Sequence, residues 1–542
     1  MSRRSAAILL LVLVAAACTV VPEASAPPRL IVFLAVDQLR YDYLERFADL
    51  YEGGFKTLLD RGALFTNARY RHGLTLTGPG HASMATGLHP SHTGITGNDW
   101  YDPELRKKVN CVDDASASTI GGPGRAASSK ALLADTLGDR LKAKYSGSRV
   151  VGLSMKDRGA ILFAGRSGDG AYWYSAECGC FVTSSQYMDH APAWLTEFNE
   201  AKPSNRFGAK PWERLIDDPA LYEKHSRVDD FKPEMDGVRT TFPHEWRSQP
   251  PDESFHTDLS ESGPADELLL DAAMAAFKGH QLGADAEPDL LAISFSGTDK
   301  VGHDYGPFSQ EAMDQHLRLD RLLGRLFAEI EKSVGMENAI IVLTADHGSA
   351  PVVEFAIEQG RPAKRVPKTA LPDAVNQAFG ARDPKIGDVI ALFDPPHIYL
   401  DKPLLESKNI PWEEAEAITH KALLDTGYVA GVYTATAMQA QPSAGDPFWA
   451  LYRNSFHEPR SPHFMVRLAE YYYVDDSQGA TGHGSPYDYD RHVPIIFMGG
   501  GVKMARHEKD CGPEDIAPTL GKMAGVEMPL EADTRLLDEL SR

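Results

Sequence analysis

Acidic and histidine side chains follow several apolar runs of this 542-residue chain. Residues 30–36 (LIVFLAV) end at an aspartate, residues 339–344 (AIIVLT) lead into an Asp-His pair, and residues 290–295 (LLAISF) run into a D-x-x-x-H pattern. Carboxylates and imidazoles that meet at one edge of a sheet make a metal site. The six candidate ligands are Asp37, Asp299, His303, Asp346, His347 and His483.

The elements around these residues indicate an α/β fold. Short, continuous apolar runs are typical of strands covered on both faces, as in parallel sheets. Amphipathic patterns predict helices between them, over residues 43–59, 130–145 (before a strand at 150–154), 266–277 and 314–334. We therefore expect a mostly parallel sheet flanked by helices on both faces, with ligands beyond the carboxyl ends of its strands.

Each aspartate taken alone is better explained as the cap of the next helix. The whole set, with histidines at short offsets, favours a metal site over a series of caps.

A second group of residues lies in TLTGPGHASMATG and the following GITGNDW. The first motif predicts a turn that leads into a helix through His81 to Thr86, with Pro79 near its first position. Thr77 would then lie at a helix N-terminus, either as a plain cap or as a hydroxyl placed to attack a phosphoryl group. Asn98 in the glycine-rich loop would return to the same rim. His81, His89 and His92 are interpreted as packing or turn residues and are left out of the metal set.

A third feature, Lys156-Asp157-Arg158, follows the predicted strand at residues 150–154. A lysine and an arginine two residues apart offer a point charge and a bidentate fork to phosphate oxygens. Without the other motifs they would be an ordinary solvated pair.

The N-terminus has the layout of a secretory signal. Two arginines in residues 1–4 precede an unbroken apolar stretch at residues 6–17 and then small residues. Residues 1–26 are therefore predicted to be a signal peptide, and Cys18 is an alternative lipid attachment site. No later segment is apolar enough to span a bilayer. We expect an exported, periplasmic protein, either soluble or tethered by lipid.

The net charge of −21 argues against a nucleic-acid-binding surface. Besides Cys18 there are four cysteines, enough for two disulfides with three possible connectivities. They are Cys111, Cys178, Cys180 and Cys511. The Cys-Gly-Cys spacing lacks a second pair or a nearby histidine, so a structural role is preferred over zinc binding.

The candidate ligands extend along most of the chain, which favours one catalytic domain over residues 27–542. Residues 165–260 and 350–475 lack the strand and helix alternation and are interpreted as insertions that form the walls above the site. Within the second insertion, residues 398–400, 428–433 and 464–474 predict a small antiparallel sheet.

The motifs together resemble a known family. VDQLRYD, TGPGHASMATG, HTGITGNDWYD, SMKDRGA, GTDKVGHDYGP, TADHG, GHGSPYDYDRHVPI and DIAPTL occur in this order from about residue 30 to about residue 525. Their combination is similar to the alkaline phosphatase superfamily, and within it to bacterial phosphate-irrepressible periplasmic phosphomonoesterases with a threonine nucleophile. The resemblance implies an alkaline phosphatase fold and the hydrolysis of small phosphate monoesters.

Carried over position by position, the resemblance implies two zinc ions. One would be held by Asp37, Thr77, Asp346 and His347, and the other by Asp299, His303 and His483. Thr77 would be the nucleophile, and the phosphate oxygens would be bound by Asn98, Lys156 and Arg158. Mixed Asp and His ligation independently suits zinc, and a metal pair can stabilise both oxygens of an in-line displacement.

Four other functions are alternatives to this one. A nucleotide pyrophosphatase/phosphodiesterase would share the metal core, but Lys156 and Arg158 favour a monoester dianion. A sulfatase would need a C/S-x-P-x-R nucleophile motif, and a phosphoglycerate mutase is more distant still. A catalytically inactive binding protein is disfavoured because the ligand set and Thr77 are complete.

Overall fold

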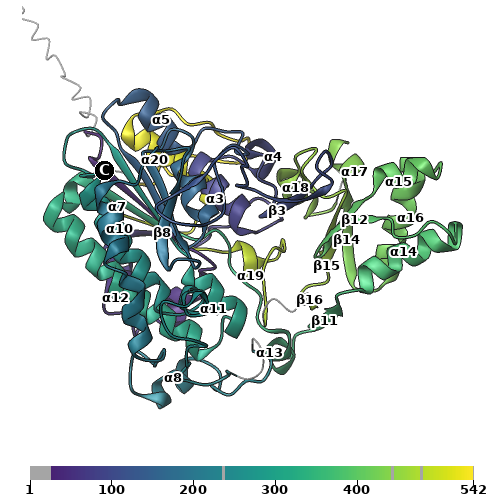
Figure 1. Cartoon of the computed structure of the whole chain (residues 1–542), viewed down its shortest axis with the longest axis horizontal. Helices are drawn as coiled ribbons and strands as arrows, with labels where there is room; N and C mark the ends of the chain where they lie inside the picture. Colours follow the sequence, from purple (N-terminus) through teal and green to yellow (C-terminus); the bar gives the residue numbers. More distant parts are fainter. Residues whose placement is uncertain (1–25, 235–238, 441–444, 476–479, 541–542) are drawn as a thin grey trace, which may run out of the picture.

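The computed structural model describes residues 26–234, 239–440, 445–475 and 480–540. The predicted signal peptide, Cys18 included, therefore lies outside the described residues, apart from Ala26. Figure 1 shows a larger body built on a central sheet and a smaller lobe, drawn in green, beside it.

The central sheet has ten strands in the order β18-β2-β17-β10-β1-β9-β6-β7-β8-β5. The strands from β10 to β7 in this order are parallel to one another, and antiparallel pairs occur on both sides of them. This arrangement confirms the predicted mostly parallel sheet. The strands are β1 (Leu30–Val36), β2 (Ala63–Phe65), β5 (Thr119–Ile120), β6 (Val150–Ser154), β7 (Gly170–Ser175), β8 (Cys180–Ser184), β9 (Asp289–Phe295), β10 (Ala339–Thr344), β17 (Ile495–Gly499) and β18 (Ala505–His507).

The three central strands end at the same level. β1 pairs in parallel with β10 on one side and β9 on the other, with Ala35 opposite Thr344 and Val36 opposite Phe295. Every residue of these strands is buried. The residues that follow each strand must therefore emerge together at one edge of the sheet.

Helices cover both faces, as predicted (Figure 1). One side carries α2 (Gly54–Arg61), α10 (Ala265–Gly279) and α12 (Gln310–Ser333), and α12 contacts both of the other two. The other side carries α3 (Thr77–Thr86), α5 (Leu137–Lys144), α6 (Asp157–Ala164) and α20 (Ile516–Ala524), which also pack together. The two layers bury the core of the larger body.

Two helix predictions were wrong at their boundaries. The pattern at residues 43–59 is divided into α1 (Tyr43–Arg46) and α2, because Asp320 of α12 binds the intervening backbone. The pattern at residues 130–145 yields a helix only from Leu137, because Thr136 and Asp139 form a capping box there.

The smaller lobe contains the predicted antiparallel sheet, in the order β12-β13-β15-β14. Its strands are β12 (Ile390–Asp394), β13 (His397–Leu400), β14 (Val429–Thr434) and β15 (Phe464–Leu468). Residues 472–474, predicted in this sheet, instead belong to β16 (Tyr472–Asp475), which pairs with β11 (Lys364–Pro367). The lobe also holds α14 (Ala370–Arg382), α15 (Lys402–Ser407), α16 (Trp412–Asp425) and α17 (Ala435–Gln439).

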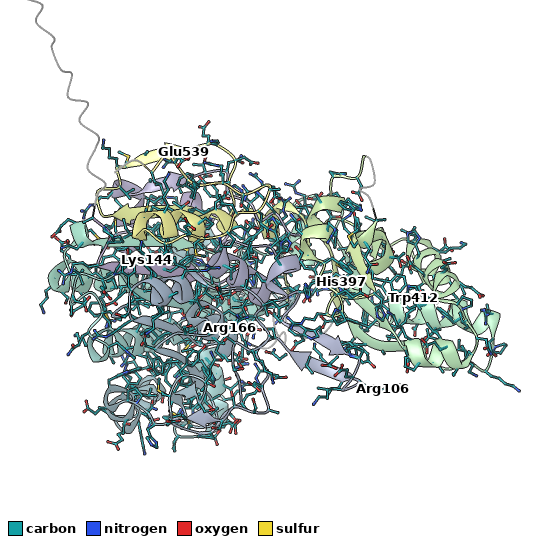
Figure 2. All side chains as sticks on the ribbon, turned by 90° about the horizontal axis from the view of Figure 1, so that it is seen from above. Arg106, Lys144, Arg166, His397, Trp412 and Glu539 are labelled. Atoms are coloured by element: carbon teal, nitrogen blue, oxygen red, sulfur yellow. A yellow bond between two sulfur atoms is a disulfide. The ribbon has the colours of Figure 1, made fainter. Side chains whose placement is uncertain are left out.

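A hairpin of the larger body reaches this lobe. β3 (Asp99–Asp102) and β4 (Lys107–Asn110) are antiparallel. Figure 2 shows Arg106 at their turn, on the same side of the molecule as the lobe in which His397 and Trp412 lie. Arg106 pairs with Asp401 at 3.0 Å, and Lys108 pairs with Asp394 at 3.0 Å. The residues that follow Asn98 therefore connect the two parts.

The remaining elements of the described chain are short or peripheral. They are α4 (Pro90–Thr93), α7 (Ala193–Glu200), α8 (Pro219–His225), α9 (Glu253–Ser260), α11 (Gly297–Tyr305), α13 (Val353–Glu358), α18 (Trp449–Ser455), α19 (Asp488–Arg491), and the 3₁₀ turns η1 (Pro203–Ala209), η2 (Met336–Asn338) and η3 (Pro513–Asp515). In the part of the chain that the structure describes, none of the helices has the length and apolar character to cross a membrane.

One disulfide joins Cys178 to Cys180, which agrees with a structural role for this motif. Cys111 and Cys511 are buried free thiols. Of the two disulfides that four cysteines allow, the structure thus has one.

Removing the Asp320 carboxylate should destabilise the larger body. Its Oδ2 accepts from the backbone N–H groups of Glu52 (2.8 Å) and Gly53 (2.6 Å), and its Oδ1 from Phe55 (2.8 Å) and Lys56 (3.3 Å). We expect Asp320→Ala to lower the free energy of unfolding by about 3 kcal/mol, because it leaves several buried donors without an acceptor. Denaturant titration measures the change.

The matched control is Asp60→Ala on α2, where the carboxylate is exposed and pairs only with Lys56. Its unfolding midpoint should stay close to that of the unchanged protein. Equal midpoints for the two variants would contradict the role given to Asp320.

Candidate active site

The first candidate metal group consists of Asp37, Asp346 and His347, all completely buried. Asp37 follows β1, and the other two follow β10, so the aligned strand ends bring them together. His347 Nε2 lies 3.5 Å from Asp37 Oδ1 and 3.5 Å from Asp346 Oδ2. Three ligand atoms thus converge on one point.

The second candidate group consists of Asp299, His303 and His483. Asp299 and His303 lie four residues apart on α11, whereas His483 comes from a loop late in the chain. The Nε2 atoms of His303 and His483 lie 3.3 Å and 3.6 Å from Asp299 Oδ1. The groups adjoin, because the rings of His347 and His483 stack with their centroids 3.5 Å apart.

Backbone carbonyls orient all three imidazoles. The Nδ1 atoms of His303, His347 and His483 lie 2.8 Å, 3.0 Å and 2.7 Å from the carbonyl oxygens of Thr481, Gly348 and Thr75. An Nδ1–H that donates to a carbonyl leaves the Nε2 lone pair free, as metal ligation requires. All three Nε2 atoms face the carboxylates.

The site has an excess of buried negative charge. Burial, together with Asp299 and Asp346, raises the pKa of Asp37 to about 7. Burial lowers the pKa of His347 to about 4, so that its imidazole is neutral at neutral pH. Asp37 Oδ1, Asp346 Oδ2 and His347 Nε2 are buried without a hydrogen-bond partner. A cation bound in the first group would satisfy these atoms. The second group offers the same kinds of ligand atom, so the residues of both groups fit metal binding.

Lys156 supplies part of the missing positive charge. Its Nζ lies 2.6 Å from Asp37 Oδ2 and 2.5 Å from Asp299 Oδ2, so it bridges the two groups. Arg158 lies two residues further on, at the start of α6, and its buried Nε has no hydrogen-bond partner. Both side chains line the same cavity.

Thr77 is the first residue of α3, so it lies at a helix N-terminus, and the helix begins two residues before Pro79. It is 1% exposed, and its neighbours tie its backbone to the site. Thr75 O binds His483, and Gly78 N–H donates to Asn98 Oδ1 at 2.7 Å. Because the oxygen of Asn98 accepts this bond, its amino group remains available as a donor.

The cavity above these residues has a volume of about 600 Å³. It is lined from the larger body by Asn98, Lys156, Arg158, Asp299, His303 and His483, and from the other side by residues such as Phe393, Arg467, Tyr472 and Tyr473. The two parts of the chain thus form one cavity.

The three histidines left out of the metal set have different environments. His81 lies 2.8 Å from both Thr77 O and Ser294 Oγ, and its Nδ1 lies 3.3 Å from Asp346 Oδ2, so it adjoins the first candidate group. His92 is largely exposed and pairs with Glu531. His89 is buried in a separate cluster with His72 and Glu514, outside the cavity.

Gln38 was missed by the sequence analysis. Its backbone N–H donates to Asp346 Oδ1 at 3.2 Å, and its Nε2 donates to Asp299 Oδ1 at 2.7 Å. It thereby contacts one carboxylate of each group, with its backbone in the left-handed region at φ 66°. Its position directly after Asp37 was the available signal.

Replacing Gln38 should weaken metal binding, although it is not itself a candidate ligand. Hydrogen bonds from neighbouring residues orient ligating carboxylates, and their loss costs about 10-fold to 100-fold in metal affinity. We expect this loss for Gln38→Ala, measured by competition with a chelator of known affinity.

Gln359→Ala, at an exposed position, is the control and should bind metal normally. Unchanged metal affinity in Gln38→Ala would refute the positioning role.

Comparisons with known proteins agree on the family. A profile described as type I phosphodiesterase / nucleotide pyrophosphatase matches residues 31–365. Alkaline phosphatase PhoV of Synechococcus elongatus is 31% identical over 96% of this chain and 94% of its own length. Alkaline phosphatase PafA of Elizabethkingia meningoseptica is 32% identical over 95% of this chain and 94% of its own.

Solved structures give the same result. The crystal structure of wild-type PafA matches with a TM-score of 0.88 and 30% identity, covering 96% of this chain and all of the PafA chain (100%). Murine ectonucleotide pyrophosphatase / phosphodiesterase 5, at 15% identity and a TM-score of 0.52, shares the fold. The chain therefore belongs to the type I phosphodiesterase / nucleotide pyrophosphatase family of the alkaline phosphatase superfamily and, within it, to the alkaline phosphatases.

Proposed function

We propose that this enzyme hydrolyses phosphate monoesters to an alcohol and inorganic phosphate at a two-zinc site, through a phosphothreonine at Thr77. The observation that carries the proposal is the meeting of two adjoining three-residue metal groups beside a cavity lined by Asn98, Lys156 and Arg158. The start of α3, which carries Thr77, is tied to the second of these groups because Thr75 O accepts from His483 Nδ1. Relatives of similar length that are named alkaline phosphatases support it.

Zinc fits the donor set. Each group offers Asp oxygens and His nitrogens, which zinc binds in catalytic sites. Thr77 is proposed as a further ligand of the Asp37, Asp346 and His347 group. When bound, the two ions would lower the pKa of the Thr77 hydroxyl and stabilise the attacking and leaving oxygens of the displacement.

Thr77 is proposed as the nucleophile. Its position at the N-terminus of a ten-residue helix favours an anion beside it. As Thr77 Oγ1 loses its proton and bonds to phosphorus, the bond to the leaving alcohol breaks and the alcohol takes up a proton. Water then cleaves the phosphothreonine, returning Thr77 and releasing phosphate.

Asn98, Lys156 and Arg158 are proposed to bind the non-bridging phosphate oxygens. The Asn98 amino group is free to donate because its carbonyl is held by Gly78. The buried Arg158 Nε without a partner gives this guanidinium an unused donor beside the cavity. Lys156 adds a charge between the metal groups.

A phosphodiesterase is the second candidate, because the matching family profile carries that description. A diester has one negative charge where a monoester has two, and its second substituent needs room rather than positive charge. Lys156 and Arg158, which line the cavity close to the metal groups, therefore favour the monoester.

We also propose export to the periplasm, with one catalytic domain over residues 27–542 and insertions at about 165–260 and 350–475. The disulfide between Cys178 and Cys180 supports an oxidising compartment.

Thr77→Ala should fold but lose turnover on an aryl phosphomonoester by on the order of a thousandfold or more, because the atom that accepts the phosphoryl group is removed. Thr77→Ser should keep part of the rate. When the unchanged enzyme is quenched with acid during turnover, peptide mapping should find phosphate on Thr77.

Thr196→Ala, an exposed threonine of α7, is the control and should retain full activity. Phosphate trapped on a different residue, or full turnover by Thr77→Ala, would refute the assignment.

Arg158→Ala tests the choice between monoester and diester. Charge-assisted hydrogen bonds contribute about 1.5–3 kcal/mol, so kcat/KM for an aryl monoester should fall roughly 10-fold to 100-fold. The corresponding diester lacks the second charge and should lose much less. Parallel rates on the two substrates give the ratio.

Arg140→Ala, on the exposed side of α5, should leave both rates unchanged. Equal losses on both substrates in Arg158→Ala, or a preference of the unchanged enzyme for the diester, would favour the phosphodiesterase.

A further inference from the structure

A third cluster of metal-ligating residues lies outside the active-site cavity. His72 belongs to the segment between β2 and α3, His89 precedes α4, and Glu514 lies in η3 near the C-terminus. One ligand atom of each lies within 4.8 Å of the others. The three side chains are completely or almost completely buried, with exposures of 0%, 2% and 0%.

The separations suit a small cation. His72 Nδ1 lies 3.4 Å from Glu514 Oε1, and His89 Nδ1 lies 3.8 Å from the same oxygen. In a tetrahedral zinc centre with bonds of about 2.0–2.2 Å, neighbouring ligand atoms are roughly 3.3–3.6 Å apart. The cluster needs little movement to reach this geometry.

Several atoms of the cluster are buried without a hydrogen-bond partner. They are both ring nitrogens of His72, Nδ1 of His89 and Oε2 of Glu514. Polar atoms in a protein interior are almost always paired with another group, an ordered water or an ion. Each of the three side chains thus has at least one unpaired atom, which indicates a ligand that the three side chains share.

The surroundings of His89 match those of a metal ligand. Its Nε2 lies 2.7 Å from Asp533 Oδ1, so the ring donates its other N–H to a carboxylate and turns Nδ1 toward the cluster. This carboxylate-histidine arrangement is the usual partner of a metal-bound imidazole. The carboxylate belongs to Asp533 in the C-terminal segment, so the cluster joins this segment to the residue that precedes α4.

The nearest arginine does not take the place of a cation at Glu514. The Arg71 guanidinium is engaged by Asp515 through two bonds of 3.1 Å and 3.0 Å, and it stays 3.8 Å from Glu514. A doubly protonated His89 alone would not satisfy the cluster, since 3.8 Å exceeds a hydrogen bond and His72 would remain without a partner.

We propose that His72, His89 and Glu514 form a structural site for a zinc-type divalent cation, separate from the catalytic centre. Two imidazoles and one carboxylate favour such a metal over magnesium or calcium, which prefer oxygen ligands. The bound ion ties together three segments that lie far apart in sequence. His72 is five residues before Thr77, so the site anchors the segment that leads into α3.

The test is the zinc content of the full-length protein after saturation with Zn²⁺ and removal of loosely bound metal. His72→Ala and Glu514→Gln should each lose about one equivalent per chain relative to the unchanged protein. His92→Ala, an exposed histidine nearby, should lose none. Zinc content unchanged in both cluster variants would overturn the proposal.

A second measurement separates this site from the catalytic one and does not depend on the cluster variants folding. In a variant with Asp37→Ala, Asp299→Ala and His347→Ala, about one equivalent of zinc should remain, and Zn²⁺ should still raise Tm. Loss of all zinc and of the Tm shift in this variant would overturn the third site. If this variant loses activity but keeps one zinc, the third site is supported, and the lost activity bears only on the proposed function.

Discussion

The structure around the active site depends on the crowding of buried negative charge at one edge of the sheet. Parallel pairing of β1 with β9 and β10 fixes the level at which these strands end, and so brings Asp37, Asp299 and Asp346 together in the interior. Buried carboxylates at this distance cannot all stay ionised without compensating positive charge. The raised pKa of Asp37 reflects this constraint. Lys156 supplies one compensating charge, and cations bound in the two groups would supply the rest.

The surrounding backbone holds the ligands in place. The three imidazoles are each fixed through Nδ1 by a carbonyl oxygen, and one of these carbonyls belongs to Thr75, next to the helix that carries Thr77. That helix approaches closely, because a Cβ on Gly80 would lie 2.5 Å from the carbonyl oxygen of Asp346. The proposed nucleophile and the candidate metal ligands are thus positioned by the same contacts. The cluster of His72, His89 and Glu514 adjoins the same stretch of chain, because His72 lies five residues before Thr77.

The two candidate activities share this metal core and differ in what surrounds it. Monoester specificity depends on positive charge beside the phosphoryl group, whereas a diester needs space for a second substituent. Lys156 and Arg158 come from the end of β6 and the start of α6, so the central sheet fixes them along with the ligands. The opposite wall comes from the smaller lobe and from β16, where Tyr472 and Tyr473 line the cavity. The leaving group would therefore meet a wall built separately from the catalytic centre.

The sequence by itself determined the central strands and the polar residues that follow them. β1, β6 and β10 were predicted to the residue, because a strand buried on both faces must be continuously apolar and local pattern is sufficient to detect it. Only the tertiary structure decided features that depend on distant partners. Asp320 binds the backbone at the start of α2 from more than 250 positions away, within the single helix predicted over residues 43–59. Gln38 matters because the strand ends bring Asp299 and Asp346 to it. His89 likewise looked like a turn residue, since nothing near it in the chain signals that Glu514 lies beside it. Local pattern records burial and periodicity, whereas contacts between distant side chains exist only once the chain has folded.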